Sequence, residues 1–301
     1  MAVRHTDLAL EARQLWMESA AETARLTGVT AQEHTREGYC VTTVEVLDET
    51  GAQTLGKPVG RYITLELDGL LRRETDAFPR AVTALASELR SLLPAEPAAP
   101  ALVVGLGNRA ITPDLLGPLA VDRLLVTRHL VAGVPEHFGH YRPVSVLTPG
   151  VLASTGIESA ELAAAAVAAL RPACVLAVDA LASRSLSRVC RTIQLSDTGI
   201  TPGSGVGNHR MALTRESLGI PVLSIGVPTV VDAATLALDI LAQAGQEAFD
   251  PEALDSRGAD LFVTPREIDT QVADLAKVIG YGLSMALNPH LTVEDLDLLL
   301  A

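Results

Sequence analysis

From residue 101 onward, short apolar runs alternate with segments of helical periodicity, and this alternation constrains the fold more than any other feature. Consecutive parallel strands need a crossover, which is usually a helix. The pattern predicts helices near 113–127, 159–170, 230–244 and 266–286, and strands at 101–106, 144–148, 174–178, 190–195, 221–226 and 260–264. The chain is therefore predicted to adopt an α/β fold with a mainly parallel, doubly wound sheet flanked by helices.

The part of the chain before this alternation has a different pattern. The β-branched segments 39–47 and 61–69, joined by a turn-forming DETGAQTLG loop, predict an antiparallel hairpin extension over 39–69. Two further helices are expected, one from Thr6 and Asp7 to Gly28 and one at 78–93. We expect a single domain over 1–301, with a proline-rich linker at 94–100 and an exposed acidic loop at 245–259.

Composition excludes several classes of function. Lys and Arg total 23 against 36 Asp and Glu, which gives a net charge of −13 and disfavours direct binding to DNA or RNA. Neither a signal peptide nor an apolar run long enough to span a membrane is visible. The three cysteines, Cys40, Cys174 and Cys190, are widely spaced, which indicates reduced thiols in a cytoplasmic compartment.

The segment GLGNRA follows the first predicted strand and imitates a dinucleotide-binding fingerprint. Gly105, Gly107 and Ala110 fit the spacing G-x-G-x-x-A. However, Pro113 fits the first position of a helix capped by Thr112, so the helix starts later than in a nucleotide site. The acidic residue that would contact the ribose about 20 residues further on is also missing. We therefore interpret the glycines as a sharp turn from strand to helix.

Two aspartates follow strand-like apolar runs and are the candidate catalytic residues. Asp114 falls in the first turn of the predicted helix, where an acidic residue also complements the helix dipole. Asp179 ends the run VLAVD, where an aspartate can equally cap the next segment. Ligands bind at the carboxyl ends of strands in open α/β sheets, so the two carboxylates can form an acid/base pair that activates a water molecule. Such a pair titrates as a unit.

A glycine-rich segment at 196–210 is the candidate substrate loop. The backbone N–H groups of Gly203, Gly205 and Gly207 can approach a ligand closely, either as an oxyanion-stabilising loop or as an ordered turn. Asp197 is a third carboxylate in this segment, and His209 is its histidine. No HExxH zinc motif and no GxSxG nucleophile elbow is present in the sequence.

Three segments resemble the spore germination protease family: TDLALEA at 6–12, GLGNRAITPDLLGP at 105–118 and VDALASRSLSRVCRTIQLSDTGITPGSGVGN at 178–208. The resemblance implies a cytoplasmic endopeptidase of the spore core or forespore, with a fold similar to that of hydrogenase maturation endopeptidases. Its implied substrates are the small acid-soluble spore proteins. It also implies a homotetramer, made as a zymogen that processes itself. The essential aspartates of the family correspond to Asp114 and Asp179.

The same resemblance implies a self-processing region at Asp7, Leu8 and Ala9. The family starts with R-T-D-L-A, whereas His5 is inserted after Arg4 here and little sequence precedes it, which puts zymogen control in doubt. In the related maturation enzymes the matching acidic positions bind a metal. A divalent ion held by Asp114, Asp179 and His209 is therefore the alternative to a metal-free site, for which no cofactor is expected. A nucleotide-binding regulator using GLGNRA and a non-catalytic scaffold are the remaining hypotheses.

Overall fold

The computed structural model describes residues 6–19, 26–96, 98–204, 210–243 and 261–300. Within these residues nine strands form one sheet, in the order β1-β2-β3-β7-β8-β6-β4-β5, and β9 pairs with β8. The strands are β1 (Val29–Arg36), β2 (Tyr39–Val46), β3 (Gly60–Glu66), β4 (Ala101–Gly105), β5 (Val144–Leu147), β6 (Cys174–Ser183), β7 (Thr192–Ser196), β8 (Val222–Asp232) and β9 (Phe262–Val263).

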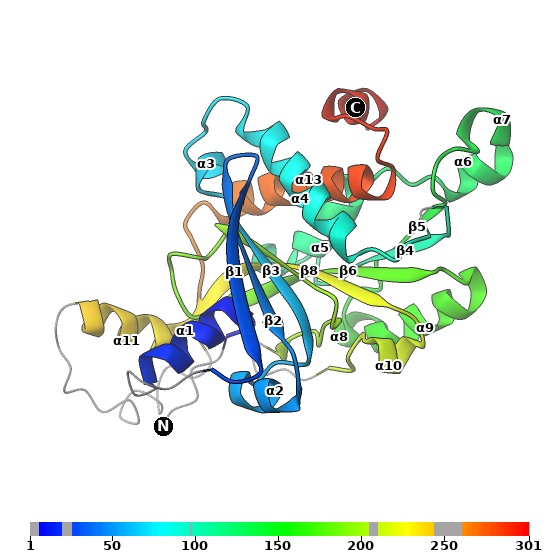
Figure 1. Cartoon of the computed structure of the whole chain (residues 1–301). Helices are drawn as coiled ribbons and strands as arrows, with labels where there is room; N and C mark the ends of the chain where they lie inside the picture. Colours follow the sequence, from blue (N-terminus) through cyan, green and yellow to red (C-terminus); the bar gives the residue numbers. More distant parts are fainter. Residues whose placement is uncertain (1–5, 20–25, 97, 205–209, 244–260, 301) are drawn as a thin grey trace.

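Helices precede, connect and cover these strands (Figure 1). Those of the first half are α1 (Ala9–Ser19), α2 (Glu49–Leu55), α3 (Asp68–Leu71), α4 (Ala77–Leu92), the 3₁₀ turn η1 (Thr112–Asp114), α5 (Leu116–Asp122), α6 (Arg128–Gly133) and α7 (Pro135–Phe138). Those of the second half are α8 (Leu152–Thr155), α9 (Ser159–Leu170), α10 (Arg215–Leu218), α11 (Ala233–Gln243), α13 (Ile268–Leu287) and α14 (Val293–Leu299).

The sheet has a parallel half and an antiparallel half. Strands β8, β6, β4 and β5 are parallel neighbours. The predicted hairpin is present as β2 and β3, which pair antiparallel. Strand β7 pairs antiparallel with both β3 and β8, and so joins the hairpin to the parallel half. The α/β class is confirmed, and the antiparallel part is larger than the predicted extension because β1 and β7 belong to it.

Apolar side chains cover both faces of the parallel half. Helices α4, α5 and α13 pack on one face, where Leu176 and Val178 of β6 join the larger core. Helices α9 and α10 lie on the other face, where Val175 and Ala177 join a smaller core. Figure 1 shows these two layers above and below the sheet. Successive residues of β6 point to opposite faces, so both layers need apolar side chains and the strand reads as one continuous apolar run.

Several elements differ from their predicted bounds. Helix α9 spans 159–170 as predicted, but the helix expected at 113–127 is split into the 3₁₀ turn η1 and the shorter α5. Thr112 lies inside this 3₁₀ turn and does not cap a helix. The loop expected after β2 contains α2, which begins after Asp48 because the Asp48 carboxylate accepts a hydrogen bond from the Gly51 N–H. Strand β6 runs past its predicted end to Ser183.

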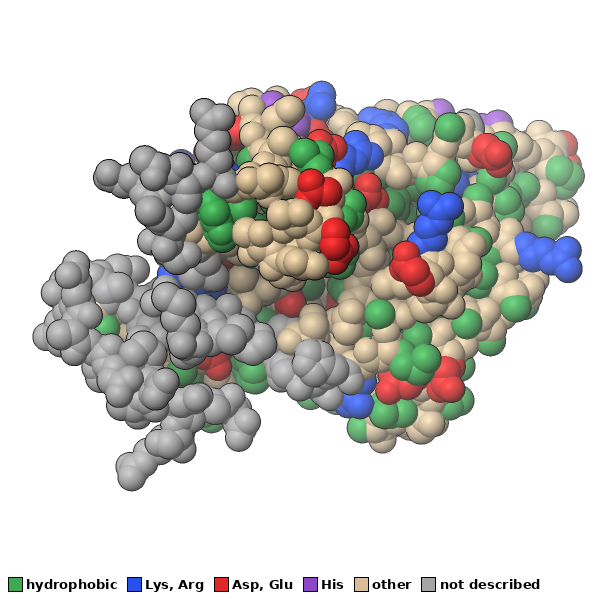
Figure 2. Space-filling view, turned by 60° about the horizontal axis from the view of Figure 1, so that its bottom comes forward, with side chains coloured by type: hydrophobic (Ala, Val, Ile, Leu, Met, Phe, Trp, Pro, Cys, Tyr) green, Lys and Arg blue, Asp and Glu red, His purple; other side chains and the backbone are tan. Residues whose placement is uncertain are grey.

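The helix predicted to reach Gly28 is described only as far as Ser19, and the predicted loop at 245–259 lies outside the described residues. None of the helices in the described ranges is long and apolar enough to cross a membrane. On the face shown in Figure 2, the coloured Lys and Arg side chains lie singly among acidic and apolar ones. The described part of this face therefore has no extended basic patch of the kind that nucleic-acid binding needs.

Candidate active site

A pocket of about 590 Å³ opens where β4 and β6 separate. The two strands pair only as far as Gly105 and Val178. The chain then leaves β4 through the turn that carries η1, while β6 continues beside β8 to Ser183. This divergence is the switch point at which open α/β sheets bind ligands. Both predicted aspartates, Asp114 and Asp179, line this pocket.

The turn after β4 fixes the position of Asp114. The Asn108 N–H donates to both the backbone oxygen of Asp114, at 3.0 Å, and its Oδ2, at 2.9 Å. Gly107 has a φ of 124°, and a Cβ there would lie 2.0 Å from the Asp114 backbone oxygen. Only glycine therefore allows the turn to close on Asp114. Burial raises the pKa of the Asp114 carboxyl to about 6, against the hydrogen bond from Asn108, which lowers it.

Asp179 lies inside β6 rather than at its end, and only 5% of its surface is exposed. Its Oδ1 accepts a hydrogen bond of 2.9 Å from the Ala180 N–H. Burial raises the pKa of the Asp179 carboxyl well above its usual value, and the negative charges of Asp114 and Asp7 raise it further. Both effects favour the protonated form of this carboxyl.

A further aspartate, Asp7, which precedes α1, also lines the pocket. Its Oδ2 accepts a hydrogen bond of 2.8 Å from the Ala182 N–H, and its Oδ1 accepts one of 3.0 Å from the Ser204 hydroxyl. The Asp7 N–H donates to the Ala182 carbonyl oxygen at 3.1 Å. The segment before α1 is therefore attached to β6 three residues beyond Asp179.

Two side chains that do not line the pocket, those of Lys57 and Gln194, hold this segment in place. The Lys57 ammonium donates to the carbonyl oxygens of Thr6 and Asp7, at 3.1 Å each. The Gln194 amide donates to the Asp7 carbonyl at 3.1 Å and accepts from the Ala9 N–H at 2.8 Å. Burial lowers the pKa of Lys57, against the charges of Asp7 and Glu11, which raise it. The carbonyl oxygens of Thr6 and Asp7 and the N–H of Ala9 are thus hydrogen-bonded to side chains, as buried backbone groups outside a sheet require.

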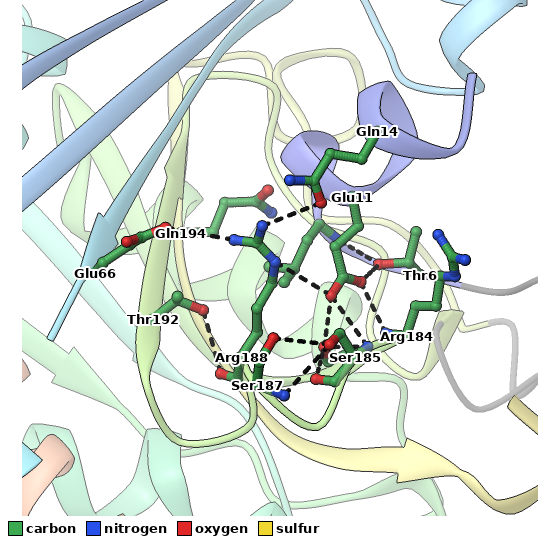
Figure 3. A network of polar contacts seen from close by, with 12 residues as sticks. Thr6, Glu11, Gln14, Glu66, Arg184, Ser185, Ser187, Arg188, Thr192 and Gln194 are labelled. Atoms are coloured by element: carbon green, nitrogen blue, oxygen red, sulfur yellow. Dashed lines mark hydrogen bonds and ion pairs between the residues drawn. The ribbon is translucent and has the colours of Figure 1, made fainter. Parts of the chain in front are cut away.

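Glu11 of α1 ties the same segment to the turn after β6 (Figure 3). Its carboxylate is 2% exposed and accepts hydrogen bonds from the Ser183 hydroxyl, the Arg184 N–H and the Ser185 N–H. Arg188 lies beside it, with its Nε 3.5 Å from Glu11 Oε1. A buried carboxylate needs such partners, because an unpaired one costs several kcal/mol.

The predicted loop residues have different positions. Gly203 lines the pocket, whereas Gly205, Gly207 and His209 lie outside the described residues. Asp197 does not line the pocket; its Oδ1 accepts a hydrogen bond of 2.8 Å from the Arg61 N–H. In the predicted processing region, the side chains of Leu8 and Ala9 are fully buried, and only Asp7 reaches the pocket.

Sequence reasoning did not place Asp7 beside the two aspartates, and it missed Ser204, Glu158 and Arg210, which also line the pocket. No local pattern signals these residues, because the contact between Asp7 and Ala182 joins positions 175 residues apart. The apolar part of the wall includes Val151, Leu152, Leu181, Val230 and Phe262. Across the described part of the chain, no group of three or more His, Cys, Asp or Glu side chains is arranged to hold a metal ion.

Comparison with known proteins identifies the family of this site. The model of the germination protease family matches residues 9–250. The chain belongs to the germination protease family. A germination protease of Caldanaerobacter subterraneus is 44% identical over 98% of this chain and 97% of its own. Germination proteases of Clostridium perfringens and Bacillus licheniformis are 41% and 39% identical, over 97% and 98% of this chain and 97% and 95% of their own.

Family membership makes this chain a peptidase of spore germination. The resemblance seen in the sequence is thereby confirmed, and the nucleotide-binding and scaffold hypotheses are set aside. The germination protease fold brings together side chains from the segment before α1, the turn after β4 and the middle of β6.

Proposed function

We propose that this protein is an endopeptidase that degrades small acid-soluble spore proteins during germination, with Asp114 and Asp179 as an acid/base pair acting on water. The observation that carries the proposal is the presence of both carboxyls in one pocket, where burial raises the pKa of each and Asp179 is the more deeply buried. Pairs of titratable groups whose surroundings separate their pKa values are suited to opposite roles in proton transfer.

The surroundings of the two carboxyls support different roles for them. Near neutral pH, Asp114 with a pKa of about 6 is mostly ionised and accepts the proton of the attacking water. Asp179 is the more deeply buried and keeps its proton, which it donates toward the oxygen of the scissile carbonyl. The water oxygen bonds to the carbonyl carbon. When this intermediate collapses, the C–N bond breaks, the proton held by Asp114 passes to the departing amine, and the proton shared with the carbonyl oxygen returns to Asp179.

The glycine-rich loop supplies the remaining component of the proposal. Gly203 lines the pocket. From the sequence, the proposal assigns stabilisation of the oxyanion to the backbone N–H groups of Gly203, Gly205 and Gly207. One such donor is worth about 3 kcal/mol in the transition state. A cytoplasmic location in the spore core, assembly as a homotetramer and self-processing at Asp7, Leu8 and Ala9 belong to the same proposal, and the family resemblance supports them.

The test is the pair of variants Asp114→Asn and Asp179→Asn. Each keeps the size of the side chain and an acceptor oxygen, so folding survives while cleavage of a small acid-soluble spore protein is abolished. Asp122→Asn is the matched control, because Asp122 is an exposed aspartate of α5 that pairs with Arg109 outside the pocket. Cleavage by either active-site variant at a rate near that of the parent refutes the acid/base pair.

A further inference from the structure

Strand β6 has an open edge beyond Asp179. On one side β8 follows β6 as far as Ser183. On the other side β4 pairs with it only as far as Val178. The residues Asp179, Ala180, Leu181 and Ala182 all line the pocket. Unpaired strand edges accept an added strand, because their N–H and C=O groups are available for pairing with another backbone.

Asp7 occupies part of this edge. Its backbone N–H donates to the Ala182 carbonyl oxygen at 3.1 Å, and its carboxylate accepts from the Ala182 N–H at 2.8 Å. The second carboxylate oxygen accepts from the Ser204 hydroxyl at 3.0 Å. Backbone and side chain of one acidic residue are therefore recognised together, in the pocket that contains the two proposed catalytic carboxyls.

We propose that the substrate binds as an extended strand along this edge of β6, with an acidic side chain at the Ala182 N–H and the Ser204 hydroxyl. The inference rests on the proposed function and adds the mode of substrate binding to it. The segment before α1 then competes with the substrate, because Asp7 fills the same contacts. A peptide of residues 6–12 has the matching chemistry, since it contains Asp7 itself.

The contacts of Asp7 indicate that it occupies a position meant for a substrate residue and does not serve only to anchor the segment before α1. Attachment to Ala182 needs only backbone pairing, whereas Asp7 also places its carboxylate in a pocket that already contains those of Asp114 and Asp179. The attachment is maintained from outside the pocket by Lys57 and Gln194, neither of which lines it. The segment can therefore be loosened at Lys57 without altering the surface offered to a substrate.

The test measures binding of a fluorescent peptide of residues 6–12 to the full-length Asp114→Asn variant, which does not cleave it. Adding Lys57→Gln removes the ammonium from the carbonyls of Thr6 and Asp7. We expect about tenfold tighter binding, because releasing a competing segment raises the fraction of binding-competent protein. Lys277→Gln is the matched control, since Lys277 contacts Asp297 instead. It should leave the affinity unchanged.

A second arm of the experiment tests strand pairing itself. The same peptide methylated at the backbone nitrogen of its aspartate lacks the N–H that would pair with the Ala182 carbonyl. It should bind at least about tenfold more weakly, because backbone hydrogen bonds supply the affinity of strand addition. A peptide with asparagine in place of the aspartate should also bind more weakly, since it loses the charge recognised by the Ala182 N–H and the Ser204 hydroxyl.

Equal affinity with and without Lys57, or equal binding of the methylated and unmethylated peptides, overturns the inference. Denaturation curves serve to check that Lys57→Gln remains folded, and Ser204→Ala gives an independent readout at the edge. Because Ser204 would hold the acidic side chain, this variant should abolish the preference for aspartate over asparagine. These binding results do not depend on catalysis, so failure of the acid/base pair and failure of this inference are distinguishable.

Discussion

Replacing Asp114 with asparagine should make the folded protein more stable at neutral pH even though it abolishes cleavage. The folded-state pKa of about 6 lies above the ordinary value of 3.8. A carboxyl with a raised pKa stabilises the fold only while it is protonated. This contribution is complete below about pH 3.8 and is lost as the pH rises through about 6.

The size of the effect follows from the shift. The difference between 6 and 3.8 corresponds to a ceiling of about 3 kcal/mol, at about 1.4 kcal/mol for each pKa unit. Asp114 is partly exposed, and screening by solvent reduces this figure to roughly 1–3 kcal/mol. Asparagine has no charge to desolvate and keeps an oxygen that can accept from the Asn108 N–H.

The assay is urea denaturation of parent and Asp114→Asn at several pH values from 4 to 7.5. The free energy of unfolding of the variant, relative to that of the parent, should grow by roughly 1–3 kcal/mol across this range. Asp122→Asn is again the control, since it loses an exposed ion pair with Arg109 and should gain nothing toward neutral pH. A difference between Asp114→Asn and the parent that does not change with pH refutes the assignment of a raised pKa to Asp114.

Four further predictions follow from the site. The kcat/KM for a fluorogenic peptide should fall as the pH drops below about 6, because Asp114 becomes protonated; a profile flat through pH 6 contradicts its role as base. Gly107→Ala should cost about 2–4 kcal/mol and most of the activity, since a Cβ there meets the Asp114 backbone oxygen, whereas Gly133→Ala meets open space and should preserve both. Glu11→Gln should lower the free energy of unfolding by about 2–3 kcal/mol in urea denaturation, because it removes a buried charge from its donors; an unchanged midpoint would show that the network contributes nothing. Rigorous metal removal should leave cleavage intact, while loss of activity that a divalent ion restores would favour metal binding by Asp114 and Asp179.

Strong periodicity made most of the parallel half predictable. Helix α9 has its predicted bounds, because its alanine-rich stretch is preceded by Glu158 and Glu161 of a capping box and followed by Arg171 and a proline. Strand β6 was recognised because both faces of the sheet need apolar side chains at its positions. The apolar runs before Asp114 and Asp179 indicate these two residues, and both line the pocket. Their catalytic role stays a prediction.

The antiparallel half was less predictable, because its elements are stabilised by tertiary contacts. Strand β1 contains the polar sequence VTAQEHTR, most of which is exposed, and among the described strands it pairs with β2 alone. Nothing in its composition marks it as a strand, since β propensity mainly reports packing against neighbours. The position of Asp7 in the pocket is equally unpredictable from the sequence. Its position is set by Ala182, Lys57 and Gln194, which lie far from it in the sequence.

The end of the pairing between β4 and β6 explains why a carboxyl can be buried here and still reach a substrate. A strand paired on both sides would bury Asp179 without access, and a strand at the edge of the sheet would leave it in solvent with an ordinary pKa. Strand β6 pairs with β8 through Ser183 but loses β4 after Val178, so Asp179 is buried in the sheet beside an open edge. The segment released from β4 supplies Asp114 at the same point. One topological feature therefore raises the pKa of Asp179, brings Asp114 to the same pocket and leaves the strand edge at which we propose that the substrate binds.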